Sequence, residues 1–465
     1  MKGCYSKSNK LMDFIRQWEI YEIDDEFTSV KRSLSIFLKR ELLGENLYSP
    51  KKFFNNRFNG IYELIKHIFF YFMFTIKWFL LLLRRDKKEI IIINFLTDKS
   101  ISEDYIDAIG KSNKYIIINF GIRYELSFLL GFNKFCFPFF FYRYLVYFED
   151  YKDYHDNLLK KLHDTLFSHN IILEKKSDKR IFKNLRHTFY IKIITTYLIE
   201  KLLKKRNIKY FIQDLEFISI GYVLTNIFKK KGITTVSIDH ALSLYKNEYN
   251  SRLSDKYLVW GNHEKLHLIN NCHVDDSKIN IIGNLKKKNE LKRTEANKFK
   301  WIYLMQSYNY NIYYLNKRNF IQTKNTIVHL NNFIKKYYPS KELIIKPHPN
   351  DKLTISNFNI NDITITSNDL DNLMPFAELV IFEDTSSAFD CLSYDSYWVY
   401  YSIEDSNAIF ENDKAIPKIQ CIDKASINNI FAENISWEKR ENIFNTYFSS
   451  VNKTLFDLNI NKILN

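Results

Sequence analysis

The stretch EIIIINF, residues 89–95, is an unbroken apolar run of strand length, and KYIIINF at 114–120 repeats it. A strand that is apolar on both faces is typical of a parallel sheet with helices on both sides, because neither face meets water. These two runs therefore predict an α/β fold in which parallel strands alternate with helices.

The alternation continues as far as residue 285. The predicted elements are a helix at 182–205, a strand at 208–214, a helix at 218–231, strands at 234–239 and 256–261, a helix that starts near residue 263, and a strand at 278–284. We interpret residues 89–285 as one doubly wound, Rossmann-like domain.

A second domain follows a polar linker. The linker, KKKNELKRTEANKFK at 286–300, has no apolar periodicity, and the pattern then restarts within residues 301–465. The elements predicted there are strands at 301–306, 342–346, 363–366, 378–382 and 397–402, and helices at 319–338 and 385–394. Two Rossmann-like domains would face each other across a cleft between the carboxyl ends of their sheets, where such folds bind ligands.

Composition limits the class of protein. A chain of 465 residues with 46% hydrophobic and 26% charged residues is globular and too long for one ordinary core. Its five cysteines include no CxxC pair, which indicates a reducing compartment such as the cytoplasm and no zinc site. The net charge of +15 favours a polyanionic partner. Because no nucleic-acid-binding motif is present and the basic residues are dispersed, a non-enzymatic nucleic-acid or membrane binder is the least favoured class.

Residues 1–88 form an N-terminal extension that carries a short apolar segment. The first residues are polar and charged and lack the apolar core of a signal peptide. The segment HIFFYFMFTIKWFLLLLRR, residues 67–85, is interrupted by Lys77 and is shorter than the roughly 20 residues of a membrane span. Basic residues at both ends suit a helix that lies in the plane of an anionic membrane surface. The alternative is a helix buried within the protein or docked on it.

The motif KPHP, residues 346–349, directly follows a predicted strand. Pro347 and Pro349 fix φ and hold the intervening backbone extended, so His348 is presented on a stiff loop with Lys346 beside it. A histidine held in this way can donate a hydrogen bond to a phosphate or protonate a phosphate leaving group. The alternative is a surface turn residue between two prolines.

A second motif, ELVIFEDTSSAFDCL, follows about thirty residues later and also begins as a strand. Thr385, Ser386 and Ser387 start the predicted helix, and hydroxyls and free amides at such a position can bind an anion or simply cap the helix. We interpret the preceding carboxylates, Glu383 and Asp384, as helix N-terminal residues rather than metal ligands. Neither GxGxxG nor GxxxxGK[ST] is present, which argues against a dinucleotide-binding domain and a P-loop.

KPHP followed by a strand and DTSSAFD resembles the donor-binding half of GT-B-fold transferases that build bacterial surface polysaccharides. This group includes the bacterial sialyltransferases and polysialyltransferases, and the CDP-glycerol glycerophosphotransferases of teichoic-acid synthesis. In these families the His-Pro histidine and the serine pair contact the phosphate of a cytidine nucleotide. The resemblance implies that His348, Ser386 and Ser387 hold the donor phosphate.

The first domain is similar to the acceptor-side half of the same group. A strand ends at Asp239-His240, a later strand ends in Trp-Gly, and a last strand ends in Gly-Asn. Alanine follows His240 where the family usually has glycine, and the acidic motif of the sialyltransferases is represented only by Asp214 and Glu216 in QDLEF. We expect Asp239 or His240 to be the catalytic base, with Asp214 or Glu216 as competitors. Gln306 and Ser307 are further donor-contact candidates by position.

The resemblance implies a glycosyltransferase of capsule or lipooligosaccharide synthesis. Because no Asp-x-Asp motif is suitably placed, we expect it to require no metal ion, and we expect no cofactor. The expected donor is a nucleotide-activated sugar, with a CMP-sugar favoured, and the expected acceptor is a glycan or a lipid-linked glycan. The alternative is the polyol-phosphate transferase that uses CDP-glycerol. We expect a cytoplasmic protein, peripheral at the inner face of the bacterial inner membrane, that does not bind nucleic acid.

Overall fold

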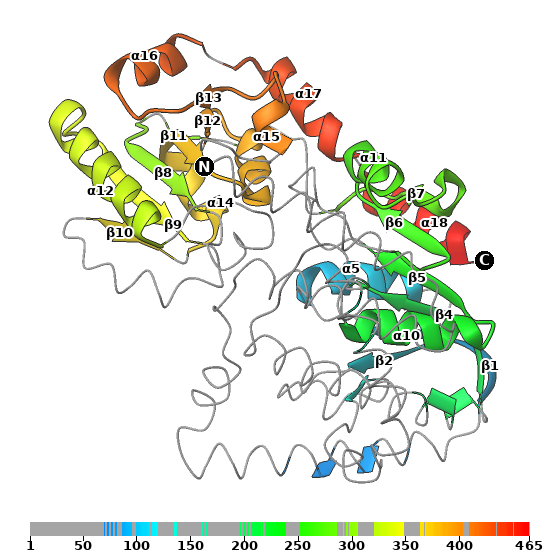
Figure 1. Cartoon of the computed structure of the whole chain (residues 1–465). Helices are drawn as coiled ribbons and strands as arrows, with labels where there is room; N and C mark the ends of the chain where they lie inside the picture. Colours follow the sequence, from blue (N-terminus) through cyan, green and yellow to red (C-terminus); the bar gives the residue numbers. More distant parts are fainter. Residues whose placement is uncertain are drawn as a thin grey trace.

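A computed structural model gives the structure of the chain. It describes residues 86–94, 99–110, 114–119, 134–136, 206–214, 216, 219–238, 252–285, 292, 294–295, 297–305, 320–347, 363–366, 368–402, 409–433, 435–449 and 451–464, with isolated residues within 69–80, 160–164 and 196–203. Two α/β units make up the described part of the chain (Figure 1).

The first unit is built on a sheet of seven parallel strands in the order β3-β2-β1-β4-β5-β6-β7. The strands are β1 (Asp86–Asn94), β2 (Lys114–Asn119), β3 (Lys134–Cys136), β4 (Arg206–Gln213), β5 (Thr234–Ile238), β6 (Lys256–Val259) and β7 (Ile279–Ile281). The strands β2 and β3 lie on one side of β1, and the later strands lie on the other. The strand order therefore reverses between β1 and β4.

Helices cover both faces of this sheet, which explains why its strands are apolar on both faces. The helices of the unit are α5 (Lys99–Gly110), α10 (Ser219–Lys230) and α11 (Asn262–Asn270), with the 3-10 turn η3 (Asp276–Lys278). Phe211 of β4 stacks on Phe228 of α10, with ring centroids 4.3 Å apart. The neighbouring Tyr210 and Ile212 belong to the core on the opposite face, with Tyr105 of α5.

The second unit has six parallel strands in the order β10-β9-β8-β11-β12-β13. They are β8 (Lys300–Leu304), β9 (Glu342–Lys346), β10 (Thr364–Ile365), β11 (Ala377–Phe382), β12 (Tyr397–Tyr401) and β13 (Lys418–Ile419). This order matches that of β3 to β6 in the first sheet, and the strand order reverses between β8 and β11.

Two cores cover the faces of the second sheet. Its helices are α12 (Phe320–Tyr337), α14 (Leu370–Leu373), η6 (Met374–Phe376), η7 (Ser386–Ser393), α15 (Ile409–Asn412), α16 (Lys424–Ala432) and α17 (Trp437–Tyr447). Trp301 and Tyr303 of β8 pack in one core with residues of α12 and α16. Phe382 and Trp398 pack in the other core with residues of η7 and α17.

The last helix, α18 (Lys453–Leu464), returns to the first unit. In Figure 1 it lies beside the first sheet, whereas α17 precedes it on the second unit. Phe456 and Ile460 belong to the core of the first sheet, and the Phe456 ring lies 5.1 Å from that of Tyr105. The final helix was predicted to be part of the second domain, 301–465, but it packs against the sheet of the first unit.

The connection between the units is attached to the second one. The backbone amides of Lys292, Glu295 and Phe299 donate to carbonyl groups of Ser393, Pro375 and Phe376 at 2.8–3.2 Å. These described residues of the predicted linker thus lie along the second unit.

The doubly wound α/β prediction is confirmed for both units, and together they give a GT-B-like architecture. The helix expected at 385–394 is instead the 3-10 helix η7, because its i to i+3 bonds continue the turn that Thr385 starts. Most of the helix predicted at 182–205 and residues 1–68 lie outside the described residues. In the described part of the chain, no helix has the length and apolar character needed to span a membrane.

Candidate functional site

The carboxyl ends of β9, β8 and β11 lie side by side at one edge of the second sheet. In the strand register, Leu304 pairs with Lys346 on one side and with Phe382 on the other. This edge includes the point where the strand order changes direction, and open α/β sheets bind ligands outside the carboxyl ends of the strands at such a point. The segments that follow Leu304, Lys346 and Phe382 therefore leave the sheet next to one another.

These segments carry the donor-side residues predicted from the sequence. Lys346 ends β9 and is half-buried, and the buried Pro347 follows it. The amide of Met305 donates to the Lys346 carbonyl at 3.1 Å and so extends the pairing of β8 with β9. The predicted residues Gln306, Ser307 and His348 lie just beyond these strands in the sequence and outside the described residues.

Thr385, Ser386 and Ser387 have different surroundings. The Thr385 hydroxyl accepts a hydrogen bond from the Ser387 amide at 3.3 Å and caps η7. Ser386 and Ser387 are half-buried, and among the described residues neither hydroxyl has a hydrogen-bond partner. Thr385 therefore holds the turn, while the two serine hydroxyls are free to donate to an anion.

Glu383 and Asp384 fix the start of this turn from opposite faces of the sheet. The Tyr400 hydroxyl donates to Asp384 Oδ1 at 2.8 Å, and the Tyr303 hydroxyl donates to Glu383 Oε1. Tyr303 and Tyr400 belong to the two different cores, so the carboxylates are held apart. Among the described residues, no group of three or more His, Cys, Asp and Glu side chains is arranged to hold a metal ion. Glu383 and Asp384 are therefore structural anchors of the turn.

Asp214 lies at the corresponding point of the first sheet. Asn94 of β1 pairs in register with Gln213, the last residue of β4, where the strand order changes direction. The buried Gln213 amide donates to the Gly221 carbonyl at 3.3 Å and to the Thr225 hydroxyl, which ties β4 to the start of α10. Asp214, which is also buried, is the first residue beyond the strand.

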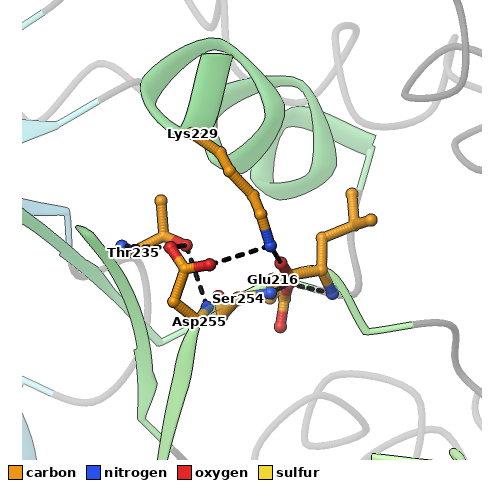
Figure 2. A network of polar contacts seen from close by, with 6 residues as sticks. Glu216, Lys229, Thr235, Ser254 and Asp255 are labelled. Carbon is orange, nitrogen blue, oxygen red and sulfur yellow. Dashed lines mark hydrogen bonds and ion pairs between the residues drawn. The ribbon is translucent and has the colours of Figure 1, made fainter. Parts of the chain in front are cut away.

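Glu216 is a buried anchor (Figure 2). Its Oε1 atom accepts hydrogen bonds from the amides of Leu253 and Ser254, both at 2.6 Å, and its side chain has no exposed area. Burial raises the pKa of Glu216, although the charge of Arg252 and the two amides act in the opposite direction. This carboxylate holds the chain just before β6, so it is less suited than Asp214 to meet an acceptor hydroxyl.

A second carboxylate holds the same segment (Figure 2). Asp255 accepts hydrogen bonds from the Thr235 amide and hydroxyl at 3.0 and 2.9 Å and pairs with Lys229 at 2.8 Å. Partial burial acts to raise the pKa of Asp255, but the bonds from Lys229 and Thr235 outweigh it and lower the pKa. This network holds the chain at the start of β6. Asp239 and His240, which follow β5 in the sequence, lie outside the described residues.

The carboxyl edges of the two sheets meet at α17. Trp260, the first residue after β6, belongs to the same core as Phe389 of η7. The ring of Tyr447 in α17 lies 4.6 Å from Phe389 and 4.9 Å from His263 at the start of α11. Elements from both carboxyl edges thus contact one helix.

Two residue pairs that resemble the acceptor-side pattern, Trp260-Gly261 and Gly283-Asn284, lie where the chain crosses between the units. The Ser449 amide donates to the Trp260 carbonyl at 2.9 Å. A Cβ atom on Gly261 would lie 2.3 Å from the Tyr447 carbonyl oxygen, and one on Gly283 would lie 2.5 Å from Val451. Gly283 also has a φ of +78°, which favours glycine. We call the segment between α17 and α18 the crossing segment. Its close packing against Gly261 and Gly283 explains why both positions are glycine.

Comparison with solved structures finds proteins of similar architecture and low identity. A UDP-GlcNAc 2-epimerase from Neisseria meningitidis is 10% identical, with a TM-score of 0.40 over 81% of this chain and 98% of that chain. A structure of the wall teichoic acid polymerase TagF is 10% identical, with a TM-score of 0.44 over 90% and 98%. HepE from Anabaena, in complex with UDP and glucose, is 9% identical, with a TM-score of 0.43 over 81% and 99%. No protein-family model matches the chain, and no curated protein matches its sequence.

Proposed function

We propose that this chain is a glycosyltransferase of bacterial surface polysaccharide synthesis that transfers a sugar from a nucleotide-activated donor, with a CMP-sugar favoured, to a glycan acceptor. One observation carries the proposal. The strands that lead into KPHP, into Gln306-Ser307 and into TSS end in register at the ligand-binding edge of a Rossmann-like sheet.

The donor side of the proposed site holds the nucleotide phosphate. Ser386 and Ser387 offer two hydroxyl donors at the start of a capped turn, and Lys346 supplies positive charge at the end of β9. His348, two residues beyond Lys346 in the sequence, would donate the hydrogen bond that neutralises the leaving phosphate.

The acceptor side supplies a base. In the proposed step the acceptor hydroxyl gives its proton to Asp239 or His240, with Asp214 as the competitor at the edge of the first sheet. A bond forms between the acceptor oxygen and the sugar carbon while the bond from that carbon to the CMP phosphate breaks. The electron pair leaves with the phosphate, whose charge the donor-side residues stabilise, so the step is written without a metal ion.

A thermal-shift screen against CMP, CDP, UDP, UMP, GDP and ADP tests this proposal. A ligand that binds only the native state raises its melting temperature, so we expect CMP to stabilise the protein most. Stabilisation by UDP or GDP instead would keep a transferase but contradict the cytidine donor. Absence of any response would favour a non-enzymatic binding protein.

The second candidate is a polyol-phosphate transferase that uses CDP-glycerol. It is favoured by DTSSAFD, residues 384–390, which resembles the serine motif of that group as well. Both enzymes release CMP, so stabilisation by CMP alone does not separate them. Incubation with CDP-glycerol and acceptor does, because only the polyol-phosphate enzyme would release CMP from that donor.

A further inference from the structure

Four large apolar side chains that precede the first sheet in the sequence are exposed. Phe69, Phe72, Ile76 and Leu80 are helical and expose 51%, 64%, 38% and 56% of their surface. We call these four residues the apolar stripe. Large apolar side chains that gather on a protein surface are typical of an interaction site.

On the helix that the sequence predicts at 67–85, the spacing places the stripe on one side. At about 100° per residue, the four positions fall within an arc of about 80°. Met73 and Lys77, which border this arc, are half-buried. The four described positions thus share one apolar arc of the predicted helix with a lysine near its margin, which is the pattern of helices that lie in a membrane interface.

The charges around the stripe indicate its partner. Four basic residues, Arg84, Arg85, Lys87 and Lys88, follow the segment in the sequence, and the whole chain carries a net charge of +15. A second copy of the chain docked on the stripe would bring these like charges together. An anionic bilayer instead offers apolar depth for the stripe and phosphate groups for the bases.

We propose that the apolar stripe docks the protein in the plane of an anionic lipid bilayer. Phe69, Phe72, Ile76 and Leu80 enter the boundary between headgroups and acyl chains, and the flanking bases contact lipid phosphates. None of these residues belongs to the proposed donor edge, so the proposal does not depend on the transfer reaction.

Vesicle flotation of the full-length protein tests the proposal. We expect binding to vesicles of phosphatidylglycerol and phosphatidylcholine, weaker binding to phosphatidylcholine alone, and a loss of binding to anionic vesicles at high salt. The double variant Phe72→Ser, Leu80→Ser should bind anionic vesicles about tenfold more weakly or less, because it removes apolar area from the interface.

A matched control comes from α18, where Leu455 and Leu458 expose 47% and 62% of their surface. The double variant Leu455→Ser, Leu458→Ser should bind anionic vesicles like the wild type. Equal binding by the two double variants, or no binding by the wild type, would overturn the proposal. If the wild type does not bind vesicles but forms a dimer, and the stripe variant does not form that dimer, a second copy of the chain covers the stripe. An unchanged circular dichroism spectrum and melting temperature in the stripe variant show that its fold is intact.

Discussion

At the scale of single residues, the structure separates the two acidic candidates near the end of β4. Asp214 directly follows the strand where the sheet changes direction, whereas Glu216 is fully buried and accepts two backbone hydrogen bonds. The TSS motif also combines a structural residue with candidate binding residues. The Thr385 hydroxyl caps the turn, whereas the hydroxyls of Ser386 and Ser387 have no hydrogen-bond partner among the described residues. Residues that look equivalent in the sequence therefore have structural and chemical roles that only their partners reveal.

Replacement of Glu216 tests its anchoring role. Glu216→Gln keeps an oxygen acceptor for Leu253 and Ser254 and removes a charge that burial disfavours, so we expect no loss of unfolding free energy at pH 7. Glu216→Ala leaves the two amides without their acceptor and should cost about 1–3 kcal/mol. Urea unfolding measures both values, and an equal loss in the two variants would contradict the anchoring role.

The pH dependence of this residue follows from its raised pKa. The folded state holds the Glu216 proton more tightly than the unfolded state, so the contribution is fully present below the unfolded pKa of about 4.3. It is lost as the pH rises through the folded pKa. The stability of Glu216→Gln relative to the wild type should therefore increase from pH 4 to pH 7. A constant difference across this range would show that the carboxyl group titrates normally.

The pKa of His267 is shifted in the opposite direction, so its effect on stability has the opposite pH dependence. Burial lowers its pKa to about 3, with the nearby charges of Arg252 and His263 acting in the same direction. The unfolded state therefore binds more protons between about pH 6.5 and pH 3, and stability falls as the pH is lowered through this range. We expect the unfolding free energy to decrease more from pH 7 to pH 5 in the wild type than in His267→Gln. Equal slopes in urea unfolding would contradict the lowered pKa.

At the scale of elements, the crossing segment after α17 determines which residues are allowed at the end of β6. Gly261 has an extended backbone that any residue can adopt, but a Cβ atom there would lie 2.3 Å from the Tyr447 carbonyl oxygen. Gly261→Ala should therefore displace the crossing segment and cost about 3 kcal/mol. Thermal and urea unfolding measure this loss.

Gly232 supplies the control for that variant. Its φ is +73°, and a Cβ atom there would meet nothing within 4 Å. Gly232→Ala should therefore cost only the backbone strain, about 1 kcal/mol. Equal losses in the two alanine variants would show that the contact with Tyr447 does not constrain the end of β6.

The predictability of each element depends on how local its cause is. The strand at 342–346 was predicted with its observed bounds because its apolar run and the following proline are local signals. The contacts of Glu216 span 37 residues, and its partners are backbone amides, which carry no sequence signal. Tyr400 of β12 meets Asp384 because β11 and β12 pair with Phe382 opposite Tyr400, and Asp384 follows two residues after Phe382. The sequence therefore indicates where the site lies but not which of its residues are structural.

At the scale of the whole molecule, the two units are connected twice. The chain passes from the first to the second near residue 300 and returns in α18, whose Phe456 and Leu464 complete the core of the first sheet. Nothing local to the sequence of α18 identifies that destination, because an amphipathic helix can pack on either unit. The return fastens the carboxyl edges of both sheets to the same helix, α17, so the proposed donor and acceptor residues lie on units that are held together.

Isothermal titration of CMP into the wild type and His348→Ala tests the proposed donor site most directly. We expect the wild type to bind CMP and His348→Ala to bind it at least about tenfold more weakly, with an unchanged circular dichroism spectrum, because a hydrogen bond to a charged phosphate is lost. The control His273→Asn, at an exposed position whose φ of 54° suits asparagine, should bind like the wild type. Unchanged CMP affinity in His348→Ala would contradict the assignment of the donor site to this edge of the second sheet.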